Sequence, residues 1–337
     1  GRRGRREAVE QVVVAIDMTE SRSVAAEPPV DSEEEECGVL DMARTWLFNE
    51  ASQSRGEPGK EVMYPDPSSQ CDIDLAKVQD MLPGAAVLPL RLQLASNMDP
   101  ALFAHYLWSA SVVLANLISV GRLPLPEDCS RAETCLELGA GSALPSLVLA
   151  ARMSERQARE GESVFFVTDY DDRSIFDALE KSVTVNLREK WRPSVSLCAH
   201  NWGSDCQPLL QRLRERRGGG EGKFRLMLLA DTLWKRECHE ILLQSIASLL
   251  DRSGVAYVAY CNHSGGDEPE SFFALATSCY GFCHREIVEP QWLSNAQHSS
   301  EGDEHLRQVR VFRMSFRSAK EWECGRGIAR QQPVDTT

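Results

Sequence analysis

Two patterns of apolar residues alternate along residues 88–316 of this chain. Short, mainly apolar runs are typical of buried strands, and apolar residues that recur every three or four positions are typical of amphipathic helices. Their alternation predicts β-α-β units and a mainly parallel sheet. The expected strands are 88–94, 134–138, 164–168, 195–199, 224–230, 255–261, 285–288 and 309–316, and the expected helices are 101–120, 144–159, 173–190, 207–216, 237–251 and 269–280.

The last seven of these strands predict a Rossmann-like α/β fold, a seven-stranded, mainly parallel sheet with helices on both faces. Residues 44–318 are expected to form this domain with an N-terminal extension, and its regular elements are expected to begin at the strand 88–94. Residues 1–43 are highly charged and poor in large apolar side chains, so we expect a disordered tail there. Residues 319–337 are expected to form a C-terminal tail.

The turn at residues 136–145, Leu-Glu-Leu-Gly-Ala-Gly-Ser-Ala-Leu-Pro, joins a buried strand to a helical pattern. Gly139 and Gly141 let the backbone turn tightly and come close to a ligand. A dinucleotide-binding turn places a small residue three positions after the second glycine, where this chain has Leu144. The turn therefore disfavours a dinucleotide, although glycines can also serve only to connect a strand to a helix.

Polar residues follow the other expected strands as well. Asp169 and Tyr170 end the second strand of the sheet, and a carboxylate there can accept both ribose hydroxyls of an adenosine. Acids in this segment can instead cap the helix that begins near residue 172. Later strands end in 201–203 (Asn-Trp-Gly), 231–234 (Asp-Thr-Leu-Trp) and 260–263 (Tyr-Cys-Asn-His). Any one of these residues alone would be a cap or a turn, but together they predict one binding site beyond the carboxyl ends of the strands.

Composition narrows the class of protein. The net charge of −13 argues against broad nucleic-acid binding, and eleven cysteines without C-x-x-C pairs fit a reducing compartment. No metal site is expected, because Cys279, Cys283 and His284 are crowded into one short segment. The longest apolar run, 104–120, is too short and too polar for a membrane span. The basic N-terminal segment lacks the apolar region of a secretory signal, so we expect a cytoplasmic protein, with a nuclear address as the alternative function of the basic segment.

Several segments together resemble family 16 of the seven-β-strand, class I S-adenosylmethionine-dependent methyltransferases. The acid and glycines at 137–141 match the E-x-G-x-G form of this family's first motif, which wraps the methionine end of the cofactor. The subgroup that they resemble includes the fungal elongation factor 1-alpha N-terminal and lysine methyltransferases and nicotinamide N-methyltransferase-like proteins. The matching segments are 90–92, 100–110 (Pro-Ala-Leu-Phe-Ala-His-Tyr-Leu-Trp-Ser-Ala), 137–145, 167–171, 201–203, 230–234 and 272–282.

The resemblance implies S-adenosylmethionine as the cofactor and gives roles to individual residues. It implies that Trp108 lines the cofactor site, that Trp202 and Gly203 lie against the adenine, and that Asp231 begins the motif that faces the transferred methyl group. An aromatic residue in an apolar helix such as 101–120 can also be part of the core. The expected cofactor-binding residues are Trp108, Glu137, Gly139, Ala140, Gly141, Asp169, Tyr170, Trp202, Gly203 and Asp231.

The chemistry of the cofactor limits what the protein must supply. A sulfonium methyl group is already activated, so its transfer to an amine needs alignment, desolvation and a deprotonated amine, without a covalent enzyme intermediate. An α-amino group, with a pKa of about 8, is an easier acceptor than a lysine at about 10.4. The candidates for orienting the amine or accepting its proton are Asp231, Tyr260 and His263.

The expected function is that of a monomeric protein N-methyltransferase acting on the N-terminal amine and a nearby lysine of elongation factor 1-alpha, as the resemblance implies. One alternative is methylation of a small heteroaromatic amine such as nicotinamide, which calls for an apolar lid over the acceptor. Another is a cofactor-binding scaffold without activity. The chain departs from the family pattern at Ala104, Ser109 and 231–234, which bears on substrate choice. A rim that would favour a protein substrate could be formed by Asp267, Glu268, Glu301, Asp303 and Glu304.

Overall fold

The computed structural model describes residues 54–65, 89–96, 103–123, 134–156, 163–189, 192–219, 222–261, 268–287 and 309–317. The tails expected at residues 1–43 and 319–337 lie outside these ranges, so both remain predictions.

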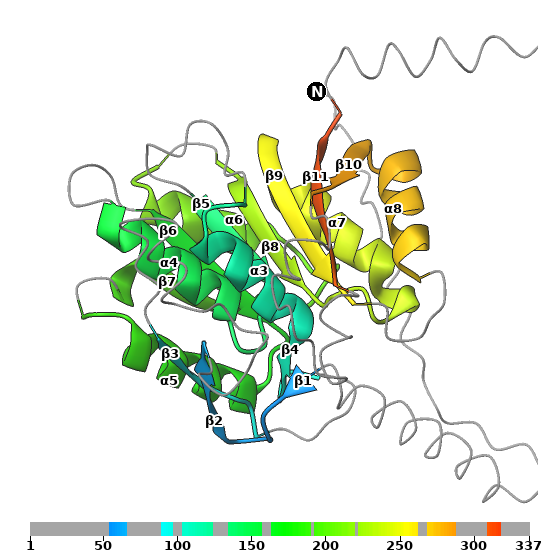
Figure 1. Ribbon diagram of the computed structural model, residues 1–337. Helices are drawn as coiled ribbons and strands as arrows, with labels where there is room; N and C mark the ends of the chain where they lie inside the picture. Colours follow the sequence, from blue (N-terminus) through cyan, green and yellow to red (C-terminus); the bar gives the residue numbers. More distant parts are fainter. Residues whose placement is uncertain are drawn as a thin grey trace, which may run out of the picture. The chain divides into compact units, whose positions relative to one another are not determined.

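A seven-stranded sheet, in the order β10-β11-β9-β8-β5-β6-β7, runs through the described residues (Figure 1). Its strands β5 to β9 pair in parallel, and β11 is antiparallel to both of its neighbours, β9 and β10. The chain builds from β5 to β6 and β7, then returns to the other side of β5 to form β8, so the strand order reverses at β5. Open α/β sheets bind ligands at such a reversal. The strands are β5 (Thr134–Leu138), β6 (Val164–Asp169), β7 (Val195–Ala199), β8 (Phe224–Ala230), β9 (Leu250–Tyr260), β10 (Phe282–Glu286) and β11 (Arg310–Phe316).

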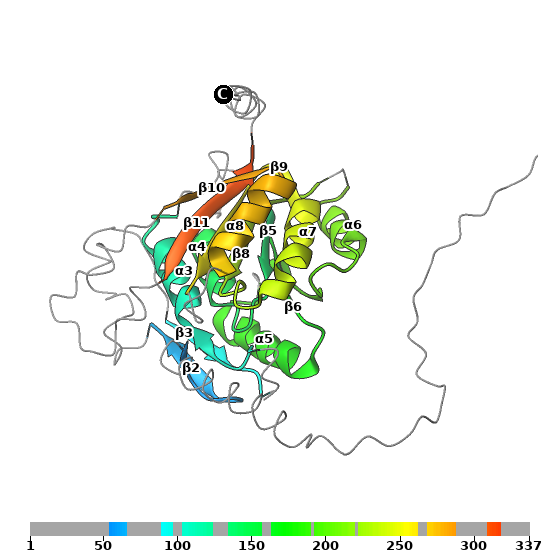
Figure 2. The same ribbon diagram turned by 90° about the vertical axis from the view of Figure 1, so that its right-hand side faces the viewer.

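Helices cover both faces of this sheet (Figures 1 and 2). Neighbouring residues of one strand pack on opposite faces, as the strand geometry requires: Cys135 packs with α3, α4 and α5, whereas Leu136 packs with α6, α7 and α8. The Rossmann-like fold expected from the sequence is therefore confirmed. The helices are α3 (Ser109–Ser119), α4 (Leu144–Arg156), α5 (Arg173–Asn186), α6 (Gln207–Arg216), α7 (His239–Leu249) and α8 (Glu268–Cys279), with short 3-10 turns η1 (Arg192–Ser194) and η2 (Arg236–Cys238).

Two small antiparallel pairs precede the main sheet in the chain. β2 (Glu61–Tyr64) pairs with β3 (Leu90–Gln93), and β1 (Ser54–Arg55) pairs with β4 (Leu107–Trp108). The buried Tyr64 hydroxyl donates to Oδ1 of Asn116 in α3 at 2.6 Å, so the extension is tied to the core of the domain. The strand expected at 88–94 exists as β3, but the expectation that regular structure begins there is wrong, because β1 and β2 come first.

The helix expected at 101–120 begins only at Ser109. Leu107 and Trp108 are extended and pair with β1, and Phe103 has a φ of 48°, which no α-helix accommodates. Other boundaries differ as well, most clearly those of β9 and β10. β9 starts at Leu250, where the helical pattern was expected to continue, because Leu250 pairs with Phe224 of β8. β10 covers residues 282–286, where 285–288 was expected.

Candidate active site

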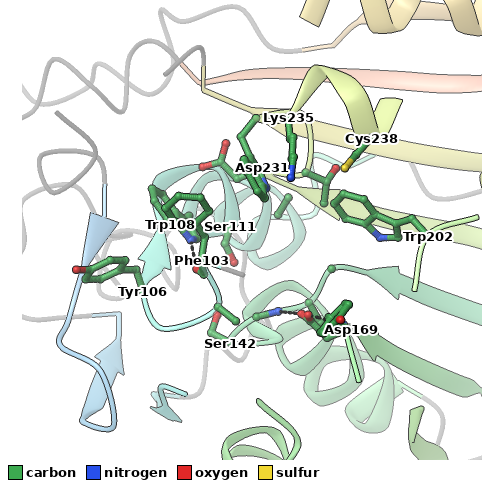
Figure 3. Close-up of a pocket in the computed structure, with 18 of the residues that line it drawn as sticks. Phe103, Tyr106, Trp108, Ser111, Ser142, Asp169, Trp202, Asp231, Lys235 and Cys238 are labelled. Carbon is green, nitrogen blue, oxygen red and sulfur yellow. Dashed lines mark hydrogen bonds between the residues drawn. The ribbon is translucent and has the colours of Figure 1, made fainter. Parts of the chain in front are cut away.

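A cleft of about 390 Å³ opens where the carboxyl ends of the parallel strands meet (Figure 3). The loops after β5, β6, β7 and β8 form its floor, and the segment before α3 and the start of α7 form its walls. This is the place that the reversal of strand order at β5 predicts. The lining residues are Phe103, Ala104, Tyr106, Trp108, Ser111, Gly139, Ala140, Gly141, Ser142, Asp169, Tyr170, His200, Asn201, Trp202, Ala230, Asp231, Thr232, Trp234, Lys235, Cys238 and Ile241.

The glycine turn after β5 needs its two glycines for different reasons. Both have positive φ, 65° at Gly139 and 50° at Gly141. A Cβ on Gly139 would lie 3.0 Å from the Trp202 ring and 3.1 Å from Cγ2 of Thr232, so the missing side chain lets these two groups close over the turn. A Cβ on Gly141 would have only the Cα of Ala104, at 3.9 Å, within reach among described atoms. The backbone at Gly141 is therefore open to a close approach by a ligand.

The carboxylate of Asp169 holds this turn from the next strand. It accepts hydrogen bonds from the backbone N–H groups of Gly141 and Tyr170, both at 2.7 Å. Burial raises the pKa of Asp169 to about 6, against the opposing effect of these two hydrogen bonds. The helix N-cap is a different acid, Asp172, whose side chain accepts from the N–H groups of Ser174 and Ile175. Asp169 is thus left with acceptor capacity at the cleft.

The loop after β7 carries Trp202 to the same side of the cleft as Asp169 (Figure 3). Its turn is fixed by a hydrogen bond from the N–H of Gly203 to Oγ of Ser245 at 2.8 Å. Gly203 itself does not line the cleft, but a Cβ there would come within 2.8 Å of Cβ of Ile241. Its role is therefore to let Ile241 approach the loop. Trp202 and Ile241 give this side of the cleft an apolar surface.

Asp231 stands at the end of β8 with a φ of 57°. Its N–H donates to the carbonyl of Ala259 at 2.8 Å, and its Oδ1 accepts from the N–H of Cys261 at 3.2 Å. A non-glycine residue with positive φ is uncommon, and such residues often mark functional sites. Nearby, the buried hydroxyl oxygens of Thr232 and Ser111 have no hydrogen-bond partner within the described part of the chain, although both residues line the cleft. A buried hydroxyl group without a hydrogen-bond partner costs free energy, and a polar ligand in the cleft would supply the partner.

Of the residues expected at the site, most line this cleft and three of the described ones do not. Glu137 is buried inside β5, where it accepts from the N–H of Ser146 at 3.1 Å and burial raises its pKa to about 8. Tyr260 is buried in the sheet, with its hydroxyl bound by Arg310 at 3.1 Å. Gly203 acts through the turn described above, and His263 lies outside the described residues.

Sequence reasoning missed several lining residues, among them Phe103, Tyr106, Lys235, Cys238 and Ile241. Phe103 and Tyr106 fall in a stretch whose spacing predicts helix. Cys238 and Ile241 match the apolar pattern of the helix expected at 237–251 and so resemble core residues. Only Lys235, which directly follows the strand-end segment 231–234, could have been proposed from its position.

Metal-binding clusters and membrane-spanning helices are both absent from the described residues. Among them, no group of three or more His, Cys, Asp or Glu side chains is placed to hold a metal ion. In the same part of the chain, no helix is long and apolar enough to cross a membrane.

Comparison with known proteins gives one consistent class. Residues 90–278, more than half of the chain, match the model of a family described as lysine methyltransferase. The chain is 27% identical over 271 residues to the protein N-terminal and lysine N-methyltransferase EFM7 of Candida glabrata, covering 80% of this chain and 94% of that protein. It is 30% identical over 228 residues to the protein of the same name from Candida albicans, covering 66% and 80%. Among solved structures, the methyltransferase domain of bacterial CtHen1 aligns at 13% identity with a TM-score of 0.40, covering 62% of this chain and 100% of that one.

Proposed function

The chain belongs to the lysine methyltransferase family, and we propose that it is an S-adenosylmethionine-dependent protein N-methyltransferase that acts on elongation factor 1-alpha. Its proposed targets are the N-terminal amine and a nearby lysine of that protein. The observation that carries the cofactor assignment is the Asp169 carboxylate, bound to the Gly141 N–H where the strand order reverses. The names of the similar Candida proteins support a protein amine as the acceptor.

The polarity of the cleft residues supports S-adenosylmethionine as the cofactor. Asp169 would accept the ribose hydroxyls, since a carboxylate keeps acceptor positions beyond its two backbone hydrogen bonds. Trp202 and Ile241 would cover the adenine with apolar surface. The buried hydroxyls of Ser111 and Thr232 would hydrogen-bond the polar amino-acid end of the cofactor, which gives them the partners that they lack among described residues.

In the proposed reaction, the residues of this chain bind the cofactor and the amine and align them for transfer. When bound, S-adenosylmethionine supplies an activated methyl group: the amine lone pair forms the new C–N bond, sulfur keeps the electrons of the broken C–S bond, and the amine proton leaves to water. Asp231, held by the N–H of Cys261, would orient the amine. Tyr260 has no place in this scheme, because its hydroxyl is bound by Arg310 and burial raises its pKa to about 12. His263 stays a prediction.

A small heteroaromatic amine such as nicotinamide is the second candidate acceptor. The aromatic rings of Phe103 and Trp234 favour it, because both line the cleft and could pack against a flat ring. The acidic rim that would favour a protein falls in segments or side chains outside the described residues. A scaffold without activity is the third reading.

We also propose that the enzyme acts as a cytoplasmic monomer, with residues 44–318 as its catalytic unit. Its net charge of −13 supports a partner other than nucleic acid.

Deuterated methyl transfer distinguishes the three readings. The full chain is incubated with S-adenosyl-(methyl-d3)-methionine and each of three acceptors: elongation factor 1-alpha, the same protein with an acetylated N-terminus, and nicotinamide. Mass spectrometry should find label on the N-terminal residue and a nearby lysine of the first protein, and only on the lysine of the acetylated one. Label on nicotinamide alone would favour the second candidate. No label on any acceptor, with cofactor binding intact, would favour a scaffold.

A further inference from the structure

One end of the cleft is walled by four half-buried aromatic side chains, Phe103, Tyr106, Trp108 and Trp234. We call this end the aromatic compartment. Figure 3 shows three of its rings on the side of the cleft opposite Asp169 and Trp202. The compartment therefore holds none of the residues assigned to the ribose or the adenine, although one of its walls, Trp108, is also a residue that the resemblance places at the cofactor site.

The rings of the aromatic compartment meet edge to face rather than stacking. Phe103 meets Trp234 at a centroid distance of 4.7 Å and Trp108 at 5.9 Å, with an interplanar angle of 77° in each case. Tyr106 meets Trp108 at 5.8 Å and 84°. In an edge-to-face pair the edge of one ring covers one face of the other, so each ring keeps at least one face that its partner does not cover, and all four residues line the cleft. The negative faces of aromatic rings attract cations.

The backbone around Phe103 holds this arrangement in place. The indole N–H of Trp108 donates to the carbonyl of Phe103 at 2.8 Å. Phe103 has a φ of 48°, a conformation that costs a bulky residue energy and persists only where its surroundings impose it. Trp108 is also fixed by its pairing with Ser54 of β1. The compartment is thus built before any ligand arrives, which favours binding.

A cation already lies at one of these rings. The Nζ atom of Lys235 is 5.9 Å from the centroid of the Trp234 ring, within the range of a cation–π contact. Lys235 is exposed, so its ammonium group can leave this position at little cost. The Trp234 ring is therefore both accessible to a positive charge and suited to one.

We propose that the aromatic compartment receives the neutral acceptor amine and retains its methylated, positively charged forms, including trimethylammonium, by cation–π contact. This inference deepens the proposed function and rests on it. During transfer the positive charge moves from the sulfur to the amine nitrogen, and ring faces placed around that nitrogen stabilise the charge where it develops. A trimethylammonium group has no N–H to donate, so hydrogen bonds no longer hold it, whereas ring faces still attract its charge. The substrate class implied is an unhindered primary amine that is methylated more than once.

Two probes of nearly equal shape test the compartment directly. Choline carries a trimethylammonium group, and 3,3-dimethylbutan-1-ol replaces its nitrogen by carbon and is neutral. Both are titrated into the full chain, with and without S-adenosylhomocysteine. The compartment predicts that choline binds about two- to thirty-fold more tightly than the neutral probe, the range of cation–π contacts. Equal binding, or tighter binding of the neutral probe, would overturn the inference.

Variants localise the effect. Trp234→Leu keeps an apolar side chain and removes a ring face, so the preference for choline should fall toward one, whereas Trp234→Phe should keep part of it. Tyr280→Leu is the matched control, since Tyr280 is an aromatic residue outside the cleft, bound to the carbonyl of Glu240, and should leave the preference unchanged. A preference that persists undiminished in folded Trp234→Leu would overturn the inference. If that variant does not fold, the wild-type comparison and Trp234→Phe still decide.

The proposed function and the aromatic compartment can be refuted separately. If S-adenosylhomocysteine does not bind, the proposed function is wrong, while the comparison of the two probes in its absence still tests the compartment. If S-adenosylhomocysteine binds and the protein does not prefer choline, the proposed function stands and the compartment is refuted.

Discussion

Substituting Glu137 by glutamine should stabilise this protein, and increasingly so as the pH rises. Glu137 is 1% exposed, and burial raises its pKa to about 8 from an ordinary value of 4.5. At pH 7 the folded protein keeps the proton while the unfolded chain releases it, so stability falls as the pH rises from about 4.5 toward 8. A pH of 7 lies about 2.5 units above the pKa of Glu137 in the unfolded chain. Each of these units corresponds to about 1.36 kcal/mol of unfolding free energy. Glutamine, neutral in both states, avoids a loss of up to about 3 kcal/mol.

The assay is urea unfolding of the wild type and Glu137→Gln from about pH 5 to about pH 8, read as free energies of unfolding. The difference between the two proteins should be small at the acidic end and should grow toward neutral pH in favour of the variant. Glu180→Gln, which changes an exposed carboxylate of α5, is the matched control and should show no such trend. A variant that is less stable by a similar amount at every pH would refute the reasoning, because it would mean that the folded protein holds Glu137 ionised against the N–H of Ser146.

Two further predictions concern single hydrogen-bonding groups. Asp169→Asn should weaken the calorimetric affinity for S-adenosylhomocysteine about tenfold or more, because hydrogen bonds to a charged acceptor contribute about 1.5–3 kcal/mol each; Asp171→Asn, an exposed acid two residues on, should not. Wild-type affinity should also fall below about pH 6, where the carboxyl becomes protonated, whereas affinity in Asp169→Asn should not follow this titration. Tyr64→Phe should lower the free energy of unfolding by about 1–3 kcal/mol, since the buried Oδ1 of Asn116 loses its 2.6 Å donor; an unchanged urea midpoint would contradict this.

Three of the five parallel strands could be predicted to the residue. The expected ranges 134–138, 195–199 and 224–230 coincide with β5, β7 and β8, because the apolar runs in this part of the sheet stop where the chain leaves it. At the antiparallel edge of the sheet, the apolar runs no longer mark where a strand begins. In β10 only Phe282 is fully buried, and the charged residues that follow it gave no pattern from which its start could be placed.

The sequence could predict the site residues that follow the ends of parallel strands. It could not predict residues whose placement depends on pairing or packing between distant segments. Asp169 and Asp231 line the cleft because parallel strands bring their carboxyl ends together. Tyr260 also ends a strand, but its side chain packs with Phe273 and Phe312 in the core on the α6–α8 face, and strand position alone did not exclude this. The aromatic compartment was hidden because the spacing of 101–120 is helical, while pairing of Trp108 with β1 forces an extended backbone.

Binding of the cofactor product, S-adenosylhomocysteine, is the most direct test of the proposal that the cleft binds S-adenosylmethionine. The full chain is titrated calorimetrically with S-adenosylhomocysteine and, separately, with NAD. We expect one molecule of S-adenosylhomocysteine to bind per chain, and we expect NAD not to bind. Clear binding of NAD without binding of S-adenosylhomocysteine would contradict the proposal.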